Sequence, residues 1–274
     1  LVITELFMTF FRSDQIIRKN IMNKTLTLLF ALSASFWLYS DDHIPEMPNF
    51  FPIEIQQCNF NGNNDMEDFM RHIDEWNDFL NEYSEYPYAG WVVTPHYRSA
   101  GDNSFDFGWL GGSNSWSSFG KIYDIWFEEA AALGAKFDKI RTCNTQTIFA
   151  AQVIRQSSPD EDSEGVMMVS NCSVSEGITP VDLAMADAKW NAYLDSNEGK
   201  GSIFRWYPAV GDSIEADYDF KNVFTASSMN EWGDGIGSII NEGGLLVQLE
   251  IYGEILSCDS PRLYQTNNVR SASN

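Results

Sequence analysis

The short stretch Phe105-Asp106-Phe107 recurs 113 residues later as Tyr218-Asp219-Phe220. Other matches follow in the same chain order, at offsets of 113 to 115 residues: Cys58 with Cys172, Trp76-Asn77 with Trp190-Asn191, Pro95 with Pro208, Phe119-Gly120 with Trp232-Gly233, Cys143 with Cys258, and Arg155 with Arg270. Chance matches between rare residue types would not keep this order, so the pattern indicates an internal duplication. We predict two copies of one unit, over residues 53–155 and 166–270, joined by an acidic linker at 156–165.

Both predicted copies have the same order of elements. In the first copy, strand and helix patterns alternate over 53–60, 65–82, 88–97, 105–111, 119–140 and 141–154. In the second copy a helix begins at Thr179-Pro180, with a capping threonine and a proline in the first turn. A hairpin over 202–210 and 218–226, a helix over 232–255 broken at Gly243-Gly244, and a strand over 257–269 follow. The predicted fold class is α+β, with two tandem ferredoxin-like β-α-β-β-α-β repeats.

Two fused units of this kind resemble the dimeric α/β-barrel superfamily. In that superfamily two four-stranded sheets pack face to face and helices cover the outside, so the resemblance implies a pseudo-dimeric α/β barrel over residues 53–270. It rests on the element order and the duplication. The repeated Trp-Asn, the stretch Phe-Asp-Phe-Gly-Trp-Leu-Gly at 105–111 and the flanking cysteines are also similar to a group of secreted proteins of marine bacteria. That second resemblance implies export and no particular activity.

The sequence from Met22 has the pattern of a secretory signal. Lys24 supplies a positive charge, residues 26–38 are apolar, and small residues follow up to Ser40. The apolar run is about 13 residues, too short to span a bilayer, although an uncleaved N-terminal anchor is an alternative. Since residue 1 is Leu, we expect 1–40 to be upstream sequence plus the signal, and 41–52 to be a tail. The expected location is periplasmic or secreted, with no stable membrane span after signal removal.

Four cysteines occupy equivalent places in the two predicted copies. An even number of cysteines in an exported chain implies disulfides. The ferredoxin-like strand order 4-1-3-2 puts the first and last strands of a copy side by side and antiparallel, which brings Cys58 to Cys143. The second copy repeats this with Cys172 and Cys258. We predict these two disulfides, and we expect no redox or zinc role because no Cys-x-x-Cys spacing is present.

Composition limits the classes of partner. The chain is 44% hydrophobic and 14% aromatic, which supports a folded core and excludes long-chain disorder. Its net charge of -22 repels nucleic acid and anionic lipid, so neither is expected as a partner. Several dimeric α/β-barrel families bind haem through a helix histidine, and the sole histidine on a predicted helix here is His72. We expect no haem, no other cofactor and no metal.

Residues present in one copy are better functional candidates than shared ones, because both copies must fold. We therefore expect Trp76 and Trp190 to be core residues. Histidine is the side-chain type that can exchange a proton near neutral pH, so His96 is the candidate catalytic residue; the alternative is a surface residue without a role. Strand alternation puts His96 and Tyr97 on opposite faces. The predicted ligand-binding residues are Trp91, His96, Tyr97, Arg98, Asp106 and Trp109.

Three functions stay open from the sequence. The first is an exported protein that binds a small apolar or aromatic molecule in an aromatic-lined cleft between sheet and helices. The second is a cofactor-free monooxygenase, cyclase or lyase with His96 as general base. The third is a structural or interaction module that disulfides make durable. Convergence of His96, Tyr97 and an acid in a cleft would favour the enzyme, an apolar cavity would favour binding, and a filled interior would favour interaction. The oligomeric state is not predicted.

Overall fold

The structure is a computed structural model that describes residues 49–98, 104–156, 164–213 and 215–272. The predicted signal segment and nearly all of the predicted tail lie outside these residues. We call residues 49–156 the first half and 164–272 the second half. The strands are β1 (Phe50–Phe60), β2 (Ala89–Tyr97), β3 (Phe107–Gly112), β4 (Arg141–Arg155), β5 (Glu164–Val174), β6 (Ser202–Val210), β7 (Phe220–Ala226), β8 (Leu256–Cys258) and β9 (Arg262–Arg270).

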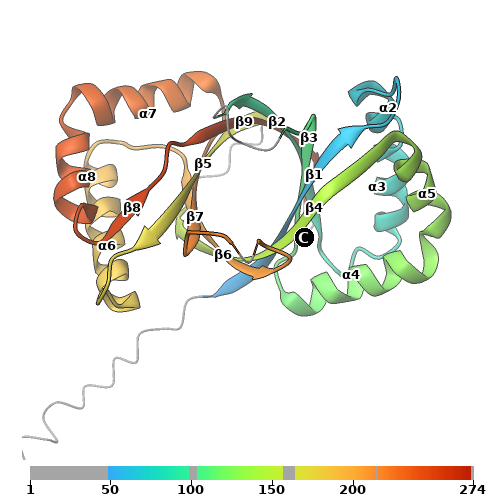
Figure 1. Cartoon of the computed structure of the whole chain (residues 1–274), viewed down its shortest axis with the longest axis horizontal. Helices are drawn as coiled ribbons and strands as arrows, with labels where there is room; N and C mark the ends of the chain where they lie inside the picture. The colour runs from blue at the N-terminus through green and yellow to red at the C-terminus, as the bar shows by residue number, and fades with distance from the viewer. Residues whose placement is uncertain (1–48, 99–103, 157–163, 214, 273–274) are drawn as a thin grey trace, which may run out of the picture. The chain divides into compact units, whose positions relative to one another are not determined.

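Eight antiparallel strands close into a barrel (Figure 1). Their order is β7-β6-β4-β1-β3-β2-β9-β5, and β5 pairs back with β7. The short strand β8 pairs with β5 outside this closed order. The first half contributes the order β4-β1-β3-β2 and the second half β9-β5-β7-β6, which is the 4-1-3-2 order twice. The halves join along two seams, β2 with β9 and β4 with β6.

Helices cover the outside of the barrel on two sides (Figure 1). Those of the first half lie against one side and those of the second half against the other. An α+β barrel with outer helices agrees with the predicted fold class. The helices are α2 (Met66–Met70), α3 (Ile73–Asn81), α4 (Trp116–Glu129), α5 (Ala131–Ile140), α6 (Pro180–Ser196), α7 (Met229–Asn241) and α8 (Gly244–Tyr252).

Two predicted helices of the first half are each broken once. The predicted helix over 65–82 is α2 and α3, separated where the His72 N–H bonds the Phe69 carbonyl three residues back. The predicted helix over 119–140 is α4 and α5, separated at Ala130, whose φ is -97° and ψ 13°. The apolar period continues through both breaks, so the sequence pattern could not reveal them. The break at Gly243-Gly244 and the Thr179 cap with Pro180 are confirmed.

An apolar cluster fills the barrel interior. Alternate residues of each strand point inward, so all eight barrel strands contribute to one cluster. Its members include Ile53, Val93, Leu110, Phe149, Ala151, Met167, Val169, Trp206 and Val223, with Tyr264 packed against them. A second cluster lies between the first-half strands and α2–α5, and it contains Trp76. Trp76 and Trp190 are both buried, as predicted.

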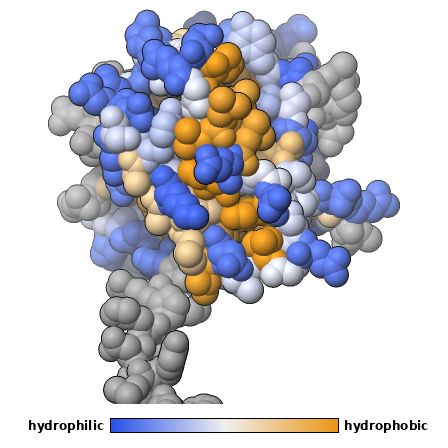
Figure 2. Space-filling view, turned by 90° about the vertical axis from the view of Figure 1, so that its left-hand side faces the viewer, coloured by the Kyte–Doolittle hydropathy of each residue, from blue (hydrophilic) through white to orange (hydrophobic). Residues whose placement is uncertain are grey.

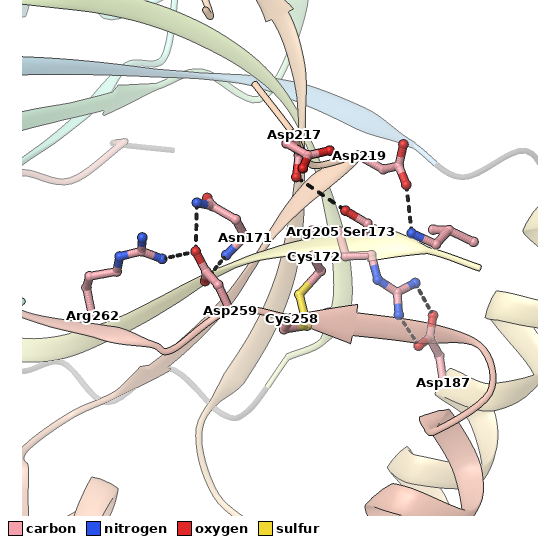
Figure 3. The surroundings of a disulfide bond; sticks show 11 residues. Asn171, Cys172, Ser173, Asp187, Arg205, Asp217, Asp219, Cys258, Asp259 and Arg262 are labelled. Atoms are coloured by element: carbon pink, nitrogen blue, oxygen red, sulfur yellow. Dashed lines mark hydrogen bonds and ion pairs between the residues drawn. A yellow bond between two sulfur atoms is a disulfide. The ribbon is translucent and has the colours of Figure 1, made fainter. Parts of the chain in front are cut away.

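The two predicted disulfides, Cys58–Cys143 and Cys172–Cys258, are confirmed. Each joins directly paired residues of neighbouring antiparallel strands. The predicted single strand over 257–269 is wrong, because β8 and β9 are separate. Between them Asp259 accepts hydrogen bonds from the Asn171 backbone and side chain and from Arg262 (Figure 3). Ser260 and Pro261 then separate the two strands.

Asparagines shared by the two halves tie each half to the other. Asn77 on α3 donates to the Val269 carbonyl of β9 at 2.9 Å, and Asn191 on α6 donates to the Ile154 carbonyl of β4 at 2.8 Å. The first long helix of each half is therefore bonded to the last strand of the other half. Within the described residues, no helix combines the length and apolarity needed to cross a membrane.

Candidate functional site

A cavity of about 290 Å³ lies between the first-half strands and helices α2–α5. The amphipathic helices α3 and α4 turn apolar faces toward the sheet, and aromatic rings form the cavity walls. These rings include Phe69 of α2, Trp76 of α3, Trp109 of β3, Trp126 of α4 and Phe137 of α5. Trp76 and Trp109 meet edge to face with their centroids 4.9 Å apart. Such walls suit a flat apolar molecule.

A buried carboxylate, that of Glu54, lines the cavity on its sheet side. Residues of β1 alternate, so Ile53 and Ile55 face the barrel interior while Glu54 faces the helices. Only 5% of Glu54 is exposed. It accepts hydrogen bonds from the hydroxyls of Tyr88 and Tyr123 and, at 2.9 Å, from the Gln56 amide. These three donors compensate for the burial of a charged group.

A glycine makes room for this hydrogen-bond network. Gly111 of β3 pairs with Glu54 of β1. A Cβ at Gly111 would lie 1.8 Å from the Tyr88 hydroxyl oxygen and 2.9 Å from a Glu54 carboxylate oxygen. Trp109 adds a further donor, because its indole Nε1 lies 3.1 Å from the Tyr88 hydroxyl. Gly111 is therefore required for the close approach of tyrosine and carboxylate.

Arg141, the first residue of β4, is the one cationic residue among the described residues that line the cavity. Its Nη1 lies 3.5 Å from the Gln56 side-chain oxygen and also contacts the Cys143 sulfur. Its guanidinium carbon lies 5.7 Å from the ring centroids of Phe69 and Phe137. Burial lowers the pKa of Arg141. The guanidinium still stays charged at neutral pH, so it adds a positive charge close to Glu54.

The two tyrosines of the network hold their protons tightly. Burial, and then the charge of Glu54, raise the pKa of Tyr88 and of Tyr123 well above the usual value of 10. A phenolate beside the carboxylate would add a second negative charge in a site with little water. Both hydroxyls therefore remain hydrogen-bond donors over the whole neutral range.

These pKa shifts predict a loss of stability in alkali. Above pH 10 the unfolded chain releases its tyrosine protons while folded Tyr88 and Tyr123 keep theirs, so the free energy of unfolding falls as the pH rises. Each tyrosine contributes up to about 1.4 kcal/mol per pH unit. Urea unfolding at several values between pH 9 and 11 measures the slope. The double variant Tyr88→Phe with Tyr123→Phe should have a shallower slope, and an unchanged slope would contradict the assignment.

The structure brings one of the six predicted ligand-binding residues, Trp109, to this cavity. Trp91 packs against the barrel-interior cluster instead. His96, Tyr97 and Arg98 lie at the exposed end of β2, with Tyr97 62% exposed. His96 lines a separate hollow of about 260 Å³ together with Glu164 and Met229.

Asp106, also predicted to bind a ligand, instead bonds the backbone at the end of β1. Its carboxylate accepts the Phe60 N–H at 2.8 Å. Asp219 accepts the Val174 N–H in the same way at 2.7 Å, as Figure 3 shows. The shared aspartates therefore have a common structural contact, next to the cysteines of β1 and β5.

Sequence reasoning did not predict four residues of the cavity. They are Glu54, its partners Tyr88 and Tyr123, and Arg141. One signal was available. Glu54 stands between Ile53 and Ile55 in the predicted strand, and at the 114-residue offset Met168 takes its place. A carboxylate on one strand and methionine on its counterpart marks a difference between the two predicted copies.

Comparison with known proteins gives a fold and no family. No family model and no curated protein matches the chain. A dye-decolorizing peroxidase from Bacteroides thetaiotaomicron VPI-5482 is similar over 83% of this chain and 97% of its own, with 10% identity and a TM-score of 0.51. An anthrone oxidase-like protein matches over 83% and 95% with 11% identity and a TM-score of 0.47. Identities this low show the fold alone. The chain has the fold of the dimeric α+β barrel proteins.

Proposed function

We propose that this protein binds a small aromatic molecule carrying a hydroxyl group, in the cavity between the first-half strands and helices. The observation that carries the proposal is the Glu54 carboxylate, buried at the side of a cavity lined largely by aromatic rings. A carboxylate has about four lone-pair positions, and Tyr88, Tyr123 and Gln56 fill three of them. At the remaining position the carboxylate accepts a hydrogen bond from the hydroxyl group of the ligand. The rings supply the apolar contact area.

The lining of this cavity does not fit a haem group. Haem iron takes an axial histidine, cysteine, methionine or tyrosine. No histidine or cysteine is among the described residues that line the cavity, and both lining tyrosines donate to Glu54. His72, on the helix side, packs edge to face on Phe137 instead, with centroids 6.0 Å apart. We therefore assign no haem step to this cavity.

A cofactor-free enzyme is a second candidate, favoured by the same carboxylate. In this reading Glu54 takes the hydroxyl proton of the bound molecule and acts as the general base. His96 is a weaker candidate for that role, because it is exposed and lines a different hollow. The nearby positive charge of Arg141 would stabilise the phenolate that forms.

We also infer that the protein is exported and built by tandem duplication. The secretory pattern from Met22 supports export, and so do two disulfides, which persist in oxidising compartments. The repeated strand order supports two ferredoxin-like repeats, for which we keep the boundaries 53–155 and 166–270.

Binding of 2-naphthol and of 2-methoxynaphthalene, followed by calorimetry, tests the proposed function. Both probes share a ring system, but the ether cannot donate a proton. We expect 2-naphthol to bind at least about tenfold more tightly, since a hydrogen bond to a charged acceptor contributes about 1.5 kcal/mol or more. Glu54→Gln should remove this preference, whereas the control His96→Ala should keep it. Absorbance of bound naphtholate would favour the enzyme over simple binding.

Two outcomes would contradict the proposal. One is equal binding of both probes to the unmodified protein. The other is an unchanged preference in Glu54→Gln, after circular dichroism has shown that the variant is folded.

A further inference from the structure

A second cavity, of about 330 Å³, lies beneath helix α7 in the second half. Its sheet side consists of the apolar residues Met168, Ile203 and Phe224, with Asn222 as the one polar residue among the described lining residues of the strands. Trp190 of α6 forms a side wall, and Ile236 and Ile239 of α7 form the cover. Met168 replaces Glu54 at the 114-residue offset, so the polar group of the first cavity has no counterpart on this strand.

Helix α7 is weakly anchored over this cavity. None of its residues is buried, whereas α4 in the first half buries Phe119, Ile122 and Ile125. Its outer surface and that of α8 are also apolar: Figure 2 shows a large apolar area on this face, and the exposed residues include Ile240, Leu245, Leu246 and Leu249. The α7–α8 pair therefore buries few side chains in the fold, and a molecule bound beneath α7 would increase the buried surface of this pair.

Three glycines in α7 weaken the helix without serving its packing. They are Gly233, Gly235 and Gly237, and a Cβ built at any of them meets no atom within 4 Å. Glycine inside a helix costs roughly 0.5 to 1 kcal/mol relative to alanine. Gly235 lines the cavity, and the buried Ile122 stands at the matching place in α4, 113 residues earlier. Missing side-chain volume at Gly235 thus helps to leave the cavity open.

The edge of the second cavity is negative. Four acidic residues line it, Glu198, Glu231, Asp234 and Glu242, and Lys200 is the one cation among its described lining residues. Three of these acids accept hydrogen bonds from neutral groups: Ser227 to Glu231, Asn230 to Asp234, and Ser238 to Glu242. Such bonds leave the negative charge in place. A positively charged group is therefore favoured at this edge.

We propose that this second cavity is a separate binding site for an apolar molecule carrying an ammonium group, and that α7 is the cover that opens to admit it. The apolar walls take the body of the molecule, and the carboxylates at the cavity edge, those of Glu198, Glu231, Asp234 and Glu242, take the ammonium group. The glycines lower the cost of opening the cover, because they lower the stability of the helix. The inference does not depend on the function proposed for the first cavity.

A matched pair of charged probes tests the ligand class. Naphthalen-2-ylmethylammonium and 2-naphthoate share a ring system and differ in the sign of the charge. We expect the ammonium probe to bind at least tenfold more tightly in calorimetric titrations, with the difference shrinking as salt is added. Equal binding, or tighter binding of 2-naphthoate, would overturn the assignment.

Two glycine variants locate the site. Gly235→Ile fills the cavity with the side chain that α4 carries at the matching place, and it should weaken binding of the ammonium probe at least tenfold. Gly233→Ala is the control: it strengthens the same helix at an exposed position that does not line the cavity, and it should change the affinity by less than twofold. Equal loss in both variants would mean that helix stability, and not cavity space, governs binding.

Two further measurements separate this proposal from its alternatives. Met168→Trp fills the same cavity from the sheet side, so it should also block the probe if Gly235→Ile does not fold. Glu54→Gln changes the first cavity alone and should leave ammonium binding intact. Loss of the probe in Glu54→Gln, with binding kept in Gly235→Ile and Met168→Trp, would place the probe in the first cavity and overturn the proposal.

Discussion

Replacing Cys172 and Cys258 with alanine should lower the free energy of unfolding by about 4 to 5 kcal/mol. The disulfide closes a loop of 86 residues, and in the chain-entropy model a loop of that length restricts the unfolded chain by this amount. In the folded state, removal of the disulfide should also weaken the pairing of β8, a strand of three residues whose pairing with β5 includes the cysteine pair itself. Urea unfolding of the double variant measures the change in free energy.

The other disulfide provides the control for this experiment. Cys58–Cys143 closes a loop of 85 residues, so its removal should cost a similar amount. The two differ in surroundings, because Cys143 lies in the long strand β4, which keeps its pairing with β1 on both sides of the cysteine. A loss below about 1 kcal/mol in either double variant would contradict the entropic account.

Asp187→Ala should destabilise the second half by about 3 to 5 kcal/mol. Asp187 of α6 and Arg205 of β6 are both buried, and two hydrogen bonds of 2.5 and 2.6 Å join them (Figure 3). Tyr252 of α8 also donates to Asp187, at 2.8 Å. Removal of the carboxylate leaves a buried guanidinium without its counter-charge, and this is the costly outcome for a buried ion pair. Chemical unfolding, followed by tryptophan fluorescence, measures it.

A second set of variants separates the cost of an unpaired charge from the contribution of the pair. Replacing the whole group, with Asp187→Leu, Arg205→Met and Tyr252→Phe, should restore most of the lost stability, because apolar residues of similar volume often replace buried ion pairs at little cost. If the triple variant is as unstable as Asp187→Ala, the ion pair itself stabilises the protein. The predicted result is recovery to within about 2 kcal/mol of the unmodified protein.

Sequence reasoning predicted the repeated strand order and both disulfides, because these depend on local patterns and on one topological rule. The strand adjacency that pairs Cys58 with Cys143 follows directly from the 4-1-3-2 order. The breaks at His72 and Ala130 escaped because a short kink leaves the apolar period unchanged. The separation of β8 from β9 was missed although a sequence signal was available, because Pro261 lies between the two strands and proline cannot donate a backbone hydrogen bond to a sheet.

The candidate site was harder to predict for a different reason. The sequence favoured His96 because histidine side chains can exchange protons near neutral pH, but this side chain is exposed at the end of β2. Glu54 becomes a functional candidate through its surroundings: the glycine opposite it, the two tyrosines and the helices that exclude water. No single stretch of sequence contains these neighbours, since Tyr123 lies 69 residues from Glu54.

The seam between β2 and β9 has a consequence for the order of events during synthesis. It pairs Gly90 with Arg270, the first half's edge strand with the last strand to emerge from the ribosome. At a synthesis rate of about 5 to 20 residues per second, about 10 to 35 s pass between the emergence of β2 and that of its partner β9. An unpaired strand edge is a template for aggregation, so the nascent chain is vulnerable throughout this interval. A holding chaperone that covers the edge of β2 would protect the chain during this interval, and the barrel would close only after β9 arrives.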